Sequence, residues 1–161
     1  MCIRDSVTIS WADRTNIHPL LPLLAALYKH DNPSAKAPTI QTIEEHCRLL
    51  LEPTTPHRLA IAWRNGEAVG LAAIGIFISI SDPRPDHWKQ IELKELFVLE
   101  ERRGIGIGTL LMDWVVEEAK AKGGYRIDWH VRRDNHRGIK FYEGFKGKVV
   151  ESRLSMRKVL L

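Results

Sequence analysis

The sequence contains little cysteine and no long apolar run. Its 161 residues include two cysteines, Cys2 and Cys47, which are too few for a disulfide framework and lack the spacing of a metal site. The longest apolar run, residues 69–80, contains glycines and is shorter than the roughly 20 residues that cross a bilayer. The first residues lack the charged and then apolar order of a signal peptide. We therefore expect no metal, no membrane partner and a reducing, cytoplasmic environment.

The sequence also lacks blocks of like charge, internal repeats and low-complexity segments. Its formal net charge of +4 comes from 24 basic and 20 acidic residues, and the basic side chains are spread along the chain. This distribution suits an anionic small molecule but does not predict nucleic-acid binding. The length predicts one domain, residues 1–161, long enough for a real core. Residues 1–6 do not join the pattern that follows, and we expect them to be a non-structural leader.

Apolar periodicity predicts the order of the helices and strands. Alternation predicts strands at residues 7–11, 57–63, 67–80, 88–98 and 125–132, with one or two closing strands within 149–161. Asn65-Gly66 predicts a hairpin turn between the second and third of these strands. Helical spacing predicts helices at residues 17–28, from the capping-box sequence at Thr42 to Leu51, from 107 to about 122, and around Phe141 and Tyr142. Strands and helices in this order predict a mixed sheet with helices on its faces, an α/β fold.

Residues 96–111 carry the strongest functional signal. A strand pattern is followed by Arg102 and Arg103, by three glycines at alternate positions within 104–108, and by a helical apolar pattern. The first turn of a helix leaves N–H groups unpaired and carries partial positive charge. Glycines let a phosphate approach those groups, and arginines add charge-assisted hydrogen bonds. The pattern indicates a pyrophosphate site, although the same glycines can serve only as a tight connection.

Two known nucleotide motifs do not fit these glycines. Their alternate spacing is not the dinucleotide fingerprint, in which two residues separate the second and third glycines. No lysine followed by serine or threonine comes after the last glycine, which argues against a P-loop.

Two motifs in this chain resemble those of the GNAT superfamily of acyl-CoA N-acetyltransferases. Arg103-Gly-Ile-Gly106-Ile-Gly108 matches its arginine-or-glutamine, x, x, Gly, x, Gly-or-Ala motif, and the preceding residues 95–98 resemble its fourth strand. Residues 135–145 resemble its Asn-x-x-Ala-x-x-Phe-Tyr-x-x-x-Gly segment, although Gly144 comes early or the turn is shortened. The resemblance implies an α/β fold with a mixed, largely antiparallel twisted sheet and helices on both faces.

The resemblance implies acetyl-CoA as cosubstrate, and its contacts carry over by position. Phe97 and Val98 would offer main-chain groups to the pantetheine arm, and Asn135 would bond the same arm. The residues expected at the pyrophosphate are Arg103, Gly104, Gly106, Gly108 and Thr109. Arg102 can contact the pyrophosphate as well, or it can equally be a charged side chain in solvent.

Tyr142 is the expected general acid. By resemblance it lies near the cofactor sulfur and protonates the leaving thiolate, which a phenol with a pKa near 10 can do while it stays neutral. The alternative is an aromatic packing partner for Phe141. Since no cysteine lies in the motifs, we expect direct attack by the amine in a ternary complex.

Glu95 is the expected general base. Its carboxylate interrupts an apolar row on one face of the strand, and burial would raise its pKa towards a useful range. The other members of this row are Ile91, Leu93 and Phe97. The alternatives are a carboxylate paired with an arginine or a side chain in an open part of the cleft. Glu92 is expected on the opposite face in a solvated pair with Lys94.

The expected acceptor is a primary amine of a small molecule, because the motifs look closest to the diamine and polyamine branch. The segments that shape the acceptor side in this family contain acidic residues that can attract a polycation or are simply solvated. These residues are Asp31, Glu44, Glu45, Asp82 and Asp86. Acetylation of a protein or peptide is an alternative function, and a non-catalytic acyl-CoA-binding module is another. Homodimerisation is an expectation from the resemblance alone.

Overall fold

The computed structural model describes residues 6–160, which contain a five-stranded sheet in the order β1-β2-β3-β4-β5. Neighbouring strands pair antiparallel from β1 to β4, whereas β5 runs parallel to β4. The strands are β1 (Val7–Trp11), β2 (His57–Arg64), β3 (Glu67–Ile78), β4 (Lys89–Val98) and β5 (Gly124–Trp129). The predicted mixed, largely antiparallel sheet is confirmed. The leader expected at residues 1–6 lies outside the described residues except for Ser6.

Helices join these strands in the predicted order. The α-helices are α1 (Leu21–Asp31), α2 (Ile40–Leu50), α3 (Ile107–Ala121) and α4 (His136–Gly144). The 3-10 helices are η2 (His18–Leu20), η3 (Pro85–His87) and η4 (Glu100–Arg102). Within residues 6–160, none of the helices combines the length and apolar character needed to cross a membrane.

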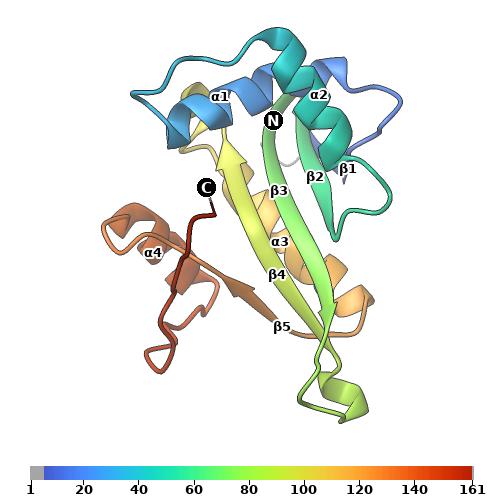
Figure 1. Cartoon of the computed structure of the whole chain (residues 1–161), viewed down its shortest axis with the longest axis vertical. Coiled ribbons are helices and arrows are strands. Elements are labelled where there is room, and N and C mark those ends of the chain that lie inside the picture. The colour runs from blue at the N-terminus through green and yellow to red at the C-terminus, as the bar shows by residue number, and fades with distance from the viewer. Residues whose placement is uncertain (1–5, 161) are drawn as a thin grey trace. The chain divides into compact units, whose positions relative to one another are not determined.

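The chain divides into two compact units, Met1–Trp129 and His130–Leu161. The first unit holds the whole sheet with α1, α2 and α3, and the second holds α4. In the first unit, α1 and α2 lie on one face of the sheet and α3 lies behind the other (Figure 1). The predicted placement of helices on both faces is therefore confirmed for this unit.

Each face of the sheet has its own apolar core. On the α1 and α2 side, Leu59, Ile61, Leu71 and Phe97 belong to one buried cluster with residues of both helices. On the other side α3 buries one stripe of its surface, as its apolar spacing predicts. This stripe consists of Ile107, Leu111, Met112, Val115 and Ala119.

Two glycine positions explain local features of this unit. Asn65 and Gly66 both have positive φ, 51° and 79°, which is the backbone of the predicted two-residue hairpin turn between β2 and β3. A Cβ on Gly70 would lie 3.0 Å from the Phe97 carbonyl oxygen and 3.1 Å from Leu111 Cδ1. The missing side chain at Gly70 therefore lets α3 pack closely on the sheet.

The start of α2 differs from the prediction. Helix α2 begins at Ile40, and its N-cap is Thr39, whose Oγ1 accepts a hydrogen bond from Thr42 N at 3.2 Å. The capping box expected to open the helix at Thr42 is therefore wrong by one turn. Thr39 satisfies a first-turn N–H group just as the predicted cap would have done.

The closing strands expected within residues 149–161 are wrong. In the described part of the chain, the strands end with β5, and residues 153–160 have no regular secondary structure. Val149, Leu154 and Leu160 are exposed to 77%, 89% and 85%. Strand propensity is realised only where a neighbouring strand supplies hydrogen bonds and packing, and this segment has no such ladder partner among residues 6–160.

Candidate active site

In the described structure, the C-terminal half of β4 pairs with a strand on one side only, so its other edge is open. Its ladder with β3 continues to Val98, but its ladder with β5 ends at the pair Leu93–Trp129. Residues 94–98 therefore have no strand partner on the β5 side in the described structure. Backbone N–H and C=O groups at such an edge can pair with an extended ligand.

A bulge in β4 decides where Glu95 points. Ile74 of β3 lies opposite Leu93, and its neighbour Ala73 lies opposite Glu95. Lys94 has no opposite residue on β3 and is therefore the extra residue of the bulge. Because directly opposed residues share a face, Glu95 lies on the Ala73 face and Leu93 on the Ile74 face.

The expected apolar row is therefore corrected. Glu95 and Phe97 face α1 and α2, since Ala73 and Phe97 both belong to the core cluster on that side. Ile91 faces α3, because a Cβ added to Gly124 would lie 2.9 Å from both Ile91 Cγ1 and the carbonyl oxygen of Ala119 in α3. The extra residue switches the alternation, which a period of two cannot anticipate.

Glu92 is corrected for the same reason. It lies opposite Gly75, two positions from Ala73, and therefore on the same face as Glu95. Its predicted pair with Lys94 is present, with 3.1 Å between Nζ and Oε1, and the Lys94 side chain is 56% exposed. The bulge thus places two carboxylates on one face, of which only Glu92 has a cationic neighbour in the described structure.

Glu95 is half-buried, and its pKa is raised above the ordinary value. Burial is the main cause, and the nearby charge of Asp31 adds to it, while a hydrogen bond from Leu96 N acts in the opposite direction. Asp31 is the last residue of α1, and the neighbouring His30 ring lies 5.6 Å from the Phe97 ring. The last turn of α1 therefore lies over Glu95 and Phe97 and increases the basicity of this carboxylate.

Arg102 and Arg103 hold the turn that follows β4. Arg103 Nε donates a hydrogen bond to the Val98 carbonyl at 2.9 Å, and its guanidinium lies 5.5 Å from the Phe97 ring centre. Arg102 Nη2 pairs with Glu67 Oε2 at 2.9 Å. Arg102 is thus an ion-pair partner rather than a solvated charge, and Glu67 is a residue that the local motif did not reveal.

The glycines make a helix start whose first N–H groups have no acceptor within the helix. Gly104 has φ of 79° and Gly106 has φ of 94°, a backbone that side chains strongly disfavour. Gly106 is the N-cap of α3 and has no side chain to cap it, and the first turn contains no acidic residue. Leu110 N donates to the Gly106 carbonyl at 3.0 Å, so the N–H groups of residues 107–109 precede the helical ladder. They are available to an anion.

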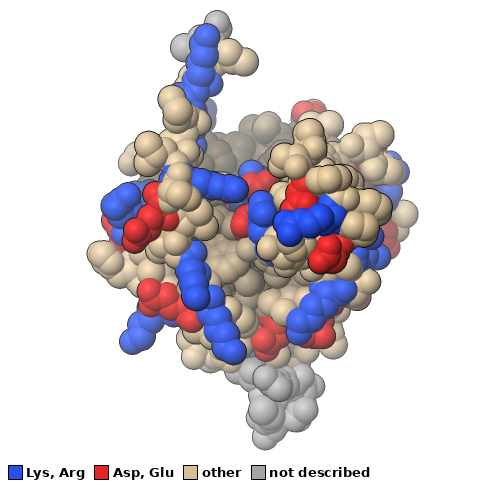
Figure 2. Space-filling view, turned by 90° about the horizontal axis from the view of Figure 1, so that it is seen from below, with Lys and Arg blue, Asp and Glu red and all other residues tan. Residues whose placement is uncertain are grey.

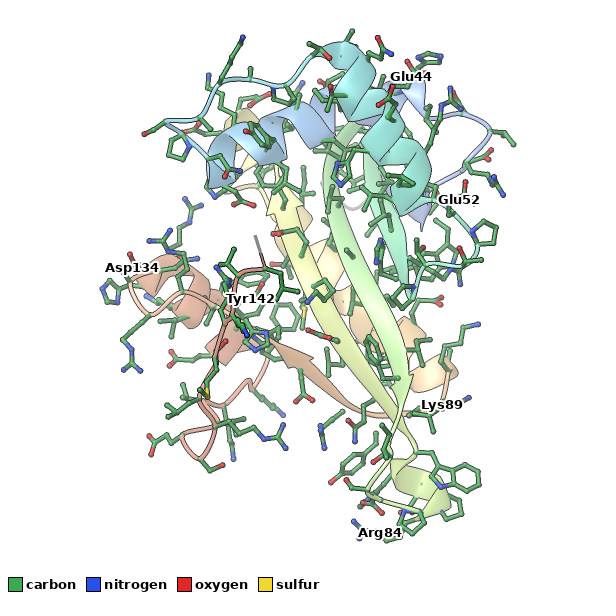
Figure 3. All side chains as sticks on the ribbon, in the orientation of Figure 1. Glu44, Glu52, Arg84, Lys89, Asp134 and Tyr142 are labelled. Atoms are coloured by element: carbon green, nitrogen blue, oxygen red, sulfur yellow. The ribbon has the colours of Figure 1, made fainter. Side chains whose placement is uncertain are left out.

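The second unit contains the other two expected residues. Asn135 is the N-cap of α4, and its Oδ1 accepts a hydrogen bond from Gly138 N at 2.9 Å. Tyr142 lies in α4, labelled in Figure 3, with its ring 5.2 Å from the Phe141 ring in an edge-to-face arrangement. The predicted aromatic contact with Phe141 is therefore present, and it leaves the acid role of Tyr142 as a prediction.

The end of α4 accounts for the irregular glycine of the second motif. Lys146 adopts φ of 61°, and Gly147 N donates to the Tyr142 carbonyl at 3.0 Å. Lys146 stands four residues after Tyr142, where the motif has glycine, so the left-handed turn is kept without its usual residue.

The first unit thus brings together Glu95, Phe97, Val98 and Arg103 beside the glycine turn at 104–108.

A signal for the bulge was present in the sequence. Apolar residues lie at positions 91, 93, 96 and 98, and the register places all four on the face towards α3. Their spacing is two residues except between 93 and 96, where it is three, as expected when one extra residue interrupts a strand.

Comparison with known proteins identifies the family. The model of the Acetyltransferase (GNAT) family matches residues 21–146, which is most of the chain and includes every residue of the candidate site. The chain belongs to the GNAT family of acetyltransferases. The resemblance carried by the two motifs is thereby confirmed.

Named GNAT relatives share part of their sequence with this chain. An aminoalkylphosphonate N-acetyltransferase from Salmonella typhimurium is 37% identical over 102 residues, 60% of this chain and 60% of the relative. An uncharacterized N-acetyltransferase from Archaeoglobus fulgidus is 39% identical over 83 residues, 51% of this chain and 54% of the relative. The alignments thus cover little more than half of the relatives' own lengths.

Solved structures share the GNAT fold over almost the whole chain. An integron cassette protein from the mobile metagenome of V. cholerae superposes with a TM-score of 0.86 at 23% identity, over 96% of this chain and 93% of that one. An aminoglycoside acetyltransferase from an uncultured soil metagenomic sample, in complex with sisomicin, superposes with a TM-score of 0.78 at 16% identity, over 99% of both chains. At these identities the likeness establishes the fold alone.

Proposed function

We propose that this GNAT protein is an acetyl-CoA-dependent N-acetyltransferase acting on a primary amine of a small molecule. One observation carries the proposal: an uncapped, uncharged helix start with two left-handed glycines directly follows the open edge of β4. An extended chain that ends in a diphosphate is complementary to this combination.

The residues at this corner fit coenzyme A. The N–H groups of residues 107–109, with Gly104, Gly106, Gly108 and Thr109 as the backbone around them, would hold the pyrophosphate. The open edge at Phe97 and Val98 would pair with the pantetheine arm, and Arg103 orients that edge through the Val98 carbonyl. Bound there, acetyl-CoA would supply the thioester and the acetyl group.

Glu95 would remove a proton from the acceptor. A primary ammonium with a pKa of about 10.4 must lose a proton before its nitrogen can attack, and a carboxylate with a raised pKa accepts that proton more readily. Burial and Asp31 raise the pKa of Glu95 in this direction. Direct transfer and transfer through a water molecule both use the same carboxylate.

Two residues of the second unit have proposed roles that rest on the resemblance of the second motif. The Tyr142 hydroxyl would donate a proton to the departing thiolate. Asn135 Oδ1 is used to cap α4, so its Nδ2 group would be the donor to the pantetheine arm. This residue would then fix the start of α4 and contact the cosubstrate with one side chain.

The class of acceptor is proposed from the relatives. The Salmonella relative is named for an aminoalkylphosphonate, and the soil metagenomic neighbour is an aminoglycoside acetyltransferase. Both names describe small molecules that carry amines. Homodimerisation and a cytoplasmic location remain predictions.

A free-thiol release assay with acetyl-CoA tests the function. The amine panel should contain diamines, polyamines, aminoglycosides, aminoalkylphosphonates and lysine-containing peptides. Release with a small amine supports the proposal, and release with peptides alone favours a protein or peptide acetyltransferase. Binding of acetyl-CoA without release from any amine would indicate a non-catalytic acyl-CoA-binding module.

A further inference from the structure

Two pockets in the first unit share part of their lining, and the second lies at the end of α3 away from the glycine turn. Their volumes are about 240 and 190 Å³. The residues that line both are Trp11, Pro53, Thr55 and Arg58. The second pocket also reaches Glu118 and Lys122 of α3 and its C-cap. At about 1.5 Å per residue, Glu118 lies roughly 17 Å along the helix from Ile107, so this pocket is separate from the proposed acetyl-CoA corner.

Arg58 lines both pockets and stacks on one of their aromatic residues. Its guanidinium carbon lies 3.7 Å from the centre of the Trp11 ring, and Trp114 contacts the same ring edge-to-face at 4.5 Å. A guanidinium that packs over an indole ring can keep its N–H groups available for hydrogen bonds in its own plane. These donors are therefore preorganised for a planar acceptor such as a carboxylate.

Among residues 6–160, Arg58 also lacks an anionic partner. Arg14 in the first pocket faces Glu52 at 3.7 Å, with Glu52 labelled beyond the end of α2 in Figure 3. Arg58, by contrast, forms no ion pair within residues 6–160. A guanidinium that is held by stacking and still has its donors in place binds a carboxylate with two hydrogen bonds at little entropic cost.

The rest of the second pocket is mainly apolar. Its walls include Ile74, which lies opposite Arg58 in the β2–β3 ladder, and Ile76, which is 37% exposed. Glu118 and Lys122 add one charge of each sign. The Lys122 carbonyl, at the negative end of α3, accepts a hydrogen bond from Lys89 Nζ at 2.9 Å, which offsets that charge.

We propose that the second pocket is a binding site for a small organic carboxylate with an apolar body. The carboxylate group pairs with Arg58, and the body packs against Ile74 and Ile76. The site does not depend on acetyl-CoA binding or on transfer of an acetyl group, and it adds a second small-molecule site to the first unit.

Benzoate and its neutral analogue benzamide test the charge requirement. The probe is the NMR signal of the Trp11 indole N–H, assigned through Trp11→Phe. We expect a saturable shift with benzoate and about tenfold weaker binding of benzamide, because only the carboxylate brings an opposite charge and two oxygens that can accept from Arg58. Equal affinities for the two compounds, or no saturable shift with benzoate, would overturn the proposal.

Arginine variants test the residue. Arg58→Gln should weaken benzoate binding about tenfold or more, and Arg58→Lys should lie between it and the wild type. Arg48→Gln is the matched control, because Arg48 is exposed on α2 and pairs with Glu44. Unchanged binding by Arg58→Gln would reject the assignment. Should that variant fail to fold, Arg58→Lys and the benzamide comparison decide the question.

Gly106→Glu separates this site from the proposed function. This variant should bind benzoate with the wild-type affinity even though it is expected to lose acetyl-CoA. Loss of benzoate binding in a folded Gly106→Glu variant would show that the two sites are not independent, which contradicts the proposal. Loss of acetyl-CoA binding alone leaves the carboxylate site standing.

Discussion

Arg102 and Arg103 are neighbours in the sequence but contact different parts of the first unit. Arg102 pairs with Glu67 at the start of β3, whereas Arg103 hydrogen-bonds the last carbonyl of β4. Glu95 and Glu92 differ in a similar way, since Glu95 is half-buried near Asp31 and Glu92 pairs with Lys94. At the residue scale, surroundings rather than residue type separate a reactive group from a structural one.

Glu95→Gln should stabilise the protein near neutral pH while it lowers acetyl transfer. Burial raises the pKa of Glu95 in the folded state above its ordinary 4.5, so the folded protein holds this proton more tightly than the unfolded chain. The wild type therefore loses stability as the pH rises from 4.5 through the raised pKa, a loss that the variant escapes.

Thermal unfolding between about pH 4 and pH 8 measures this difference. The variant and the wild type should melt alike at the acidic end, and the variant should melt higher at neutral pH. Glu92→Gln, at an exposed pair on the same strand, is the control and should show no such rise. A difference that does not change with pH would contradict the assigned environment of Glu95.

Tyr142→Phe should lower kcat about a hundredfold with little change in the KM for acetyl-CoA. The change removes the hydroxyl but keeps the ring and its contact with Phe141. Steady-state kinetics by thiol release provides the measurement. Tyr28→Phe, which removes a hydroxyl bound to the Lys36 carbonyl, is the matched control. An unaltered kcat in Tyr142→Phe would assign the residue to packing.

At the scale of elements, two helix ends determine the candidate site. Helix α3 begins at a left-handed glycine, and α1 ends over Glu95 and Phe97. The bulge in β4 connects them, because it turns Glu95 towards α1 while the same strand continues into the glycine turn. A regular strand would place Glu95 against α3, among apolar side chains.

Gly106→Glu should abolish acetyl-CoA binding in calorimetry while the circular dichroism spectrum stays native-like. A carboxylate at the N-cap of α3 would occupy the anion site and repel the pyrophosphate. Gly66→Glu introduces the same residue at φ of 79° in the hairpin turn and is the control for backbone strain. Micromolar binding by Gly106→Glu would remove the assignment of the pyrophosphate site.

Lys146→Gly should stabilise the end of α4. Lys146 adopts φ of 61°, a conformation that costs a residue with a side chain about 1 kcal/mol relative to glycine. Glycine removes this strain from the folded state, but its greater conformational freedom in the unfolded chain cancels part of the gain. The expected net gain is about 0.5 kcal/mol, or about 1–2 °C in Tm if the two units unfold together. Lys148→Gly, outside the turn, should not stabilise, and a similar gain there would contradict the role of φ.

At the scale of the whole molecule, the two units differ in their share of the core. All the buried hydrophobic side chains of residues 6–160 lie between Val7 and Ala119, in the first unit. The proposed pyrophosphate site and base belong to that unit, whereas Tyr142 and Asn135 belong to the second. On the face shown in Figure 2, basic and acidic side chains are interspersed, so this face carries no large patch of one charge.

Hydrogen exchange should reflect this difference between the units. Amides of β3 pair with a strand on each side and are covered by cores on both faces, so they should exchange only through extensive unfolding. Amides of α4, whose residues include no fully buried side chain, should exchange through local opening with lower protection. Native-state exchange followed by mass spectrometry measures both, and equal protection of α4 and β3 would contradict this expectation.

The sequence by itself determined the type and order of the elements from β1 to α4, the hairpin turn at residues 65–66 and the glycine-based start of α3. These features depend on local periodicity and on backbone conformations that few residues tolerate, so a short window of sequence specifies them. The tertiary structure alone decided which partners Arg102 and Arg103 have and that residues 153–160 form no strand. It also decided between the two sequence patterns in β4, strict alternation and the apolar row at 91, 93, 96 and 98, that give Glu95 different faces. Each of these depends on register or on a partner distant in the chain, because pairing across the sheet is a long-range interaction.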